Sequence, residues 1–125
     1  MQDQEAREIL EDVFLKAAMQ VGTPLSARRY EKLKLDSQRR TVPAGGNLYQ
    51  KARDGANPGN IITDEPDGRL VLLTLSGFGR RNPAVVELVF TDADVTVTAW
   101  AKEGLIRQKS AQKAVEAALQ ELGLA

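Results

Sequence analysis

The sequence contains no cysteine and no histidine among its 125 residues, and these two absences exclude more chemistry than any motif in the chain suggests. Without them there can be no thiolate nucleophile, no Ser-His-Asp triad, no zinc site built from thiolates or imidazoles, and no disulfide. Catalysis would depend on Asp, Glu, Lys, Ser, Thr or Tyr alone. The sequence leaves an enzyme open but favours a protein with no catalytic set, no cofactor and no metal.

Long apolar runs and net charge are missing as well. Runs such as LVLL and AVV are far shorter than the roughly 20 apolar residues of a membrane-spanning helix. The 17 basic and 17 acidic residues balance, so no overall field attracts nucleic acid or a membrane surface. The first twelve residues carry five acids and one arginine, unlike a secretory signal. We expect no membrane span and, by default, a cytoplasmic location, with an exported chain whose signal was removed as the alternative.

Apolar periodicity predicts an amphipathic helix near each end of what we expect to be a single domain, residues 1–125. Residues 5–20 place five apolar side chains on one face: Ile9, Leu10, Val13, Phe14 and Ala17. Residues 110–122 form a similar apolar stripe, with Ser110 as the expected cap and Gly123 at the stop position.

Three strands are predicted between these helices, at 69–76, 84–90 and 95–101, because these segments are rich in β-branched and aromatic residues. Short connections between them imply an antiparallel meander. The predicted fold class is therefore α+β, with a meander of about four to six strands. We expect the N-terminal and C-terminal helices to pack on one face of the sheet, as a two-layer sandwich.

Two segments leave their structure open. Residues 42–68 hold five of the 10 glycines and three of the five prolines. They read either as loops and short strands, with NLYQKAR and NIIT pairing across DGANPG, or as one long functional loop. Residues 26–35 alternate leucine with lysine as an edge strand does, but Thr23 followed by Pro24 also suits the start of a helix.

The stretch SGFGRRNP places Gly77 and Gly79 after a predicted strand, as in a dinucleotide-binding loop. No third glycine follows at the required spacing, and Pro83 leads into another strand rather than a helix. A phosphate would then lack the helix N-terminus that binds it. We interpret this stretch as a hairpin turn.

One candidate binding site lies at the start of the last helix. Cations crowd this end, although the helix dipole disfavours them there unless an anion is bound. The hypothesis is a site for an anion or an acidic partner, formed by Arg107, Lys109, Ser110 and Lys113. The alternative is that these cations pair with acids that the fold brings close, such as Asp92, Asp94 or Glu103.

A second candidate is a basic segment that holds eight of the 17 basic residues, together with both tyrosines. Basic groups interleaved with aromatic rings are typical of single-stranded nucleic-acid binding. Its members are Arg28, Arg29, Tyr30, Lys32, Lys34, Arg39, Arg40, Tyr49, Lys51 and Arg53. The alternative is an edge strand guarded by lysines, with ordinary surface charge.

Two acidic groups, Asp92 with Asp94 and the residues 64–67, fall in predicted turns, where Asp forms local hydrogen bonds, so we assign no metal. The function that the sequence favours is a non-catalytic interaction domain, which binds a protein partner or self-associates as a homodimer through its sheet and helices. The alternative function is single-stranded nucleic-acid binding through residues 28–53.

Overall fold

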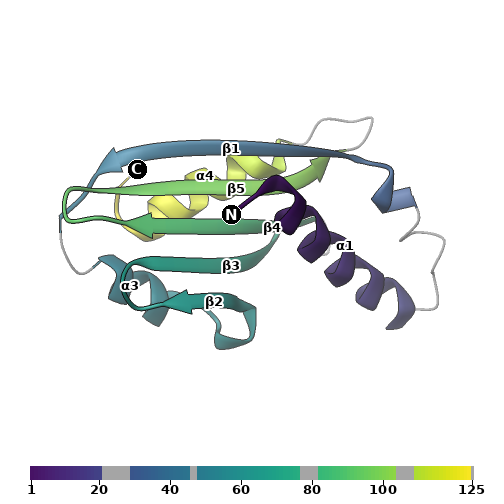
Figure 1. Cartoon of the computed structure of the whole chain (residues 1–125), viewed down its shortest axis with the longest axis horizontal. Helices are drawn as coiled ribbons and strands as arrows, with labels where there is room; N and C mark the ends of the chain where they lie inside the picture. Colours follow the sequence, from purple (N-terminus) through teal and green to yellow (C-terminus); the bar gives the residue numbers. More distant parts are fainter. Residues whose placement is uncertain (21–28, 46–47, 77–81, 104–108, 125) are drawn as a thin grey trace.

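The computed structural model describes residues 1–20, 29–45, 48–76, 82–103 and 109–124. Within them, helices lie near both ends of the chain, and four of the five strands follow one another with no helix between them (Figure 1). In order, the elements are α1 (Asp3–Gln20), β1 (Lys34–Pro43), α3 (Leu48–Gly55), the short 3-10 helix η1 (Pro58–Asn60), β2 (Ile61–Glu65), β3 (Arg69–Ser76), β4 (Asn82–Phe90), β5 (Asp94–Glu103) and α4 (Ser110–Glu121).

The five strands form one antiparallel sheet in the order β1-β5-β4-β3-β2. Strands β2 to β5 follow one another as a meander, and β1 pairs with β5 at the far edge. The α+β class and the antiparallel meander predicted from the sequence are confirmed. The three predicted strands correspond to β3, β4 and β5, and the two predicted terminal helices to α1 and α4.

Helices cover both faces of the sheet. Val97 and Ala99 of β5 lie in one buried cluster with Val115 and Leu119 of α4. Trp100, which points to the opposite face, lies in a second cluster with Leu10 of α1. Figure 1 accordingly shows α1 in front of the sheet and α4 behind it.

The expected placement of both helices on one face is therefore wrong, and the fold has three layers. The physical reason lies in β4, where the neighbouring residues Val85 and Val86 point to opposite faces and are both buried. A strand that is apolar on both faces requires cover on both, and β4 receives it from α1 and α4.

Residues 42–68 differ most from expectation. The segment NLYQKAR was expected to be a short strand or loop, but Leu48–Gly55 is the helix α3. Leu48, Tyr49 and Ala52 lie on one side of this helix and pack against the cluster under α4. The segment NIIT does enter a strand, β2, but β2 pairs with β3 rather than with residues 48–53.

Two remaining expectations concern connections. Helix and strand were both considered for residues 26–35. In the described part of this segment, residues 29–31 form a helical turn and β1 then begins at Lys34, so both structures are present one after the other. Residues 77–81, which include both glycines of SGFGRRNP, lie outside the described residues. Ser76 pairs with Asn82 in the antiparallel β3–β4 ladder, so a strand follows this connection, as the hairpin interpretation requires.

Candidate functional site

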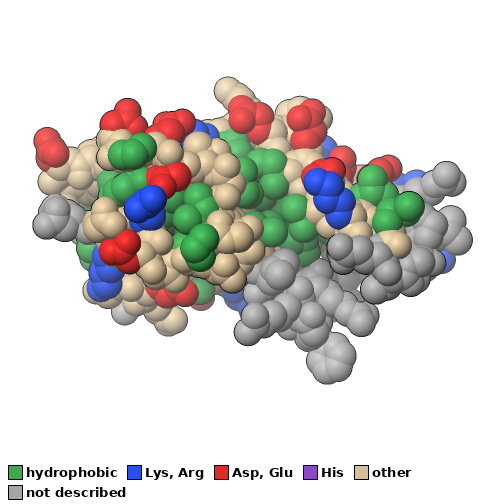
Figure 2. Space-filling view, turned by 90° about the horizontal axis from the view of Figure 1, so that it is seen from below, with side chains coloured by type: hydrophobic (Ala, Val, Ile, Leu, Met, Phe, Trp, Pro, Cys, Tyr) green, Lys and Arg blue, Asp and Glu red, His purple; other side chains and the backbone are tan. Residues whose placement is uncertain are grey.

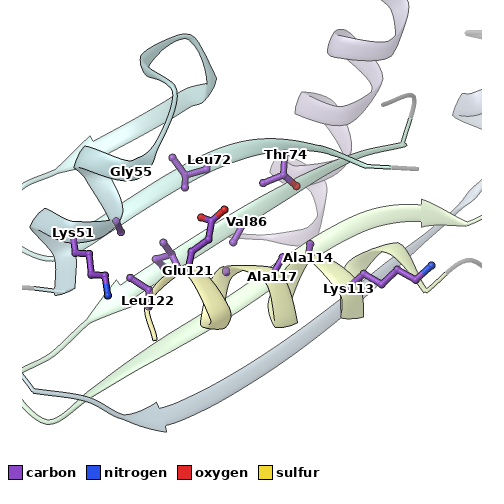
Figure 3. Close-up of a pocket in the computed structure, with 13 residues that line it drawn as sticks. Lys51, Gly55, Leu72, Thr74, Val86, Lys113, Ala114, Ala117, Glu121 and Leu122 are labelled. Carbon is purple, nitrogen blue, oxygen red and sulfur yellow. The ribbon is translucent and has the colours of Figure 1, made fainter. Parts of the chain in front are cut away.

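An open groove of about 680 Å³ lies between α3 and α4, over β3 and β4 (Figure 3). Its lining is mainly apolar. The residues that form it are Lys51, Ala52, Gly55, Leu72, Thr74, Val86, Leu88, Lys113, Ala114, Ala117, Ala118, Glu121 and Leu122.

The groove exists because the two helices on this face leave part of the sheet uncovered. Helix α4 packs over β5, β1 and β4, and presents three short side chains, Ala114, Ala117 and Ala118, to the groove. Helix α3 has only eight residues and contacts β3 near one end. Leu72 of β3 consequently remains only partly buried.

Charged side chains lie around this apolar floor. Lys51 stands at the α3 end of the groove and Lys113 at the opposite end, while the Glu121 carboxylate points from α4 toward the strands (Figure 3). All three residues are exposed. Within the described part of the chain none of the three forms an ion pair, so their charges are available to a bound molecule.

The side of the molecule that carries β2 and α3 shows hydrophobic side chains between charged ones (Figure 2). Ile62, which belongs to β2, has 39% of its surface exposed. Single exposed hydrophobic residues are common on protein surfaces. The groove differs from them because its apolar residues are contiguous and lie in a hollow.

A smaller cavity of about 480 Å³ lies where the β4–β5 turn approaches α3. Asp67, Asp92 and Asp94 line it. The Asp94 carboxylate already has a partner within the β4–β5 turn, because it accepts a hydrogen bond from the Thr91 hydroxyl at 2.9 Å. Within the described residues no group of three or more acids is arranged to hold a metal ion.

On the α1 face, a buried lysine joins three segments. The Lys102 ammonium donates hydrogen bonds to the Glu11 carboxylate and to the backbone oxygens of Tyr30 and Glu31. Its side chain is fully buried, and it also lies over the Tyr30 ring, 5.1 Å from the ring centre. Because its three hydrogen bonds connect β5 to α1 and to residues 30–31, we interpret Lys102 as a structural link between these segments.

The candidate anion site has a different local structure from the one expected. Lys109, not Ser110, occupies the cap position of α4, and Ser110 is the first helical residue. The Ser110 backbone amide donates a hydrogen bond to the Glu103 carboxylate at 2.8 Å, so Glu103 lies at the start of α4 and occupies an amide there that a bound anion would use. Lys109 is exposed, Lys113 lines the groove, and Arg107 lies outside the described residues.

The basic segment does not gather on one surface. Lys34, Arg39 and Arg40 belong to β1, at one edge of the sheet, whereas Lys51 and Arg53 belong to α3, near the opposite edge. Arg53 is paired with Asp64 of β2 at 2.6 Å. Of the other cations, Arg29 and Lys32 are exposed, and Arg28 lies outside the described residues.

Both tyrosines of this segment are engaged inside the protein. Tyr30 is buried and stacks on Phe14, with ring centres 4.2 Å apart. Tyr49 packs edge-on against Phe90, with ring centres 5.9 Å apart. The buried Tyr30 ring is therefore not available for stacking with a base, and the Tyr49 ring is partly buried in its contact with Phe90.

Comparison of the chain with models of protein families, with curated proteins and with solved structures found no match. The described helices include none long and apolar enough to cross a membrane. The fold itself defines the class of the protein: a three-layer α+β arrangement with an apolar groove on one face.

Sequence reasoning missed this groove. Leu72 and Val86 were assigned to strands, and Ala114 and Ala118 to the apolar stripe of residues 110–122, which is correct, but their periodicity predicts burial and not an opening. One signal was present: alanine occupies many of the stripe positions in residues 110–122, and such small side chains cover little of a sheet.

Proposed function

We propose that this protein is a non-catalytic interaction domain, and that the groove between α3 and α4 binds an apolar segment of a protein partner. The observation that supports this proposal most directly is the apolar hollow beside the alanine face of α4, where Leu72 is only partly buried. The lack of cysteine and histidine in the sequence agrees with a binding role.

The groove favours a helical segment because alanines form one of its walls. Its volume lies within the roughly 300–1,000 Å³ range of ligand sites in proteins. Alanine side chains on α4 allow a second helix to approach closely, and apolar helices commonly dock in such grooves through residues spaced three and four apart. Unpaired charges at the rim then restrict which segments bind.

A selection of random peptides displayed on phage, carried out on the full chain, tests the proposal. We expect enriched peptides with apolar residues at helical spacing. Their amide shift perturbations should map to Leu72, Val86 and Ala117. Ala117→Trp fills the groove and should weaken peptide binding at least about tenfold, a loss of about 1.4 kcal/mol.

Gln112→Trp is the matched control, because Gln112 is exposed on the same helix but does not line the groove. It should leave peptide affinity unchanged. The proposal is contradicted if no peptide is enriched, or if the enriched peptides bind Ala117→Trp as tightly as the unmodified protein.

A further inference from the structure

We infer that the segment bound in the groove is helix α4 of a second copy of this chain, packed antiparallel to α4 about a two-fold axis at Ala117. The inference rests on the proposed function, since it names the partner for the same groove. It assigns the protein a homodimeric state with a defined interface.

Charge complementarity carries the argument. Lys113 and Glu121 lie four residues before and four residues after Ala117, so all three lie along the same side of α4. In an antiparallel pair centred on Ala117, Lys113 of each copy faces Glu121 of the other. Each copy of α4 thus contributes one lysine and one glutamate, and the two copies together form two equivalent ion pairs.

Neither charge is satisfied within the described part of the chain. Residues 113 and 121 are separated by about 12 Å along the helix axis, at 1.5 Å per residue, so they cannot pair with each other. Neither forms an ion pair with any other residue that the structure describes. A second copy is the simplest partner that offers the complementary charge at both positions.

The steric requirements of a two-fold interface are also met. Residues near the axis contact themselves, so they must be small for two helices to approach closely. Ala117, at the centre, is exposed, and Ala114 and Ala118 beside it are only partly buried. The approaching helix would cover Leu72 and Thr74 on the floor of the groove.

Sedimentation velocity from low to high micromolar concentration tests the inference. The expected species at high concentration has twice the chain mass of 13.6 kDa. Lys113→Glu and Glu121→Lys each place like charges opposite one another twice. Each should raise the dissociation constant about tenfold. The double variant restores opposite charges and should return the dissociation constant to that of the unmodified chain.

Gln112→Lys serves as the control for a charge change on an exposed part of α4 outside the groove, and circular dichroism checks that each variant folds. A chain that stays monomeric at all concentrations overturns the inference alone, because a monomer can still bind a selected peptide in its groove. A dimer that responds to neither single variant, or that the double variant fails to restore, overturns it too, since its interface then lies elsewhere.

Discussion

At the residue scale, Glu87 is a buried acid of the described chain that has two cationic hydrogen-bond partners. It lies on β4 and accepts hydrogen bonds from Arg69 at 2.8 Å and from the Met1 ammonium at 3.0 Å. Burial by itself raises the pKa of Glu87, but the hydrogen bonds and the attraction of both cations outweigh it. The pKa of Glu87 therefore lies below its ordinary value.

This shift predicts a pH dependence of stability. Because the pKa of Glu87 is lowered by folding, its contribution is fully present above the unfolded-chain pKa of about 4.3 and is lost as the pH falls through the folded pKa. Glu87→Gln should lower the free energy of unfolding by about 2 kcal/mol at pH 7. Urea titrations should show the difference shrinking in acid.

Glu65→Gln is the control for this measurement, because Glu65 also pairs with Arg69 but is half exposed. It should change the stability by less than about 0.5 kcal/mol. An effect of Glu87→Gln that is equally large at pH 7 and at low pH would show that packing, and not ionisation, is what the substitution disturbs.

At the scale of elements, the β2–β3 hairpin depends on one glycine. Gly68 has φ +131°, and a Cβ atom there would lie 2.7 Å from the backbone oxygen of Phe90. The Gly68 oxygen also accepts a hydrogen bond from the Phe90 amide at 2.7 Å, so this contact joins the turn to β4. Neither backbone can move away without breaking this hydrogen bond.

We expect Gly68→Ala to lower the free energy of unfolding by about 2 kcal/mol or more, because it adds both conformational strain and a steric clash. Gly55, at the end of α3, has open space around it, and Gly55→Ala should be neutral or stabilising by up to about 1 kcal/mol. Thermal or urea unfolding measures both. Equal effects of the two substitutions would contradict the structural role of Gly68.

Elements also differ in how well local sequence determined them. Helices α1 and α4 and strands β3 to β5 were predicted because each carries a long, regular apolar pattern. Helix α3 was missed, since its eight residues lie between Gly45 and Gly59, where breakers dominate the composition. Its helical state is supported by the packing of Leu48, Tyr49 and Ala52 on the core, which is a tertiary effect.

At the scale of the whole molecule, the positions of the basic residues determine whether a protein with no net charge has a surface that can bind nucleic acid. The sequence brings eight cations close together along the chain, but the fold places three of them on β1 and two on α3, near opposite edges of the sheet. A nucleic-acid strand would need these cations along one continuous path. The structure does not bring them together in this way.

We therefore expect no saturable binding of a fluorescent single-stranded oligonucleotide at physiological salt, as measured by anisotropy. Arg40→Gln on β1 and Lys51→Gln on α3 should leave any weak binding at low salt almost unchanged, because neither residue belongs to a shared surface. Saturable micromolar binding that both substitutions weaken, with a steep salt dependence, would restore the nucleic-acid hypothesis.

The sequence by itself determined the excluded chemistry, the two terminal helices and the antiparallel central strands, since these follow from residue types and local periodicity. Only the tertiary structure decided which face each helix covers, because β4 is apolar on both faces and accepts cover on either. The groove was decided in the same way. It depends on how far α3 and α4 lie apart over β3 and β4, and the sequence pattern of a single element contains no such distance.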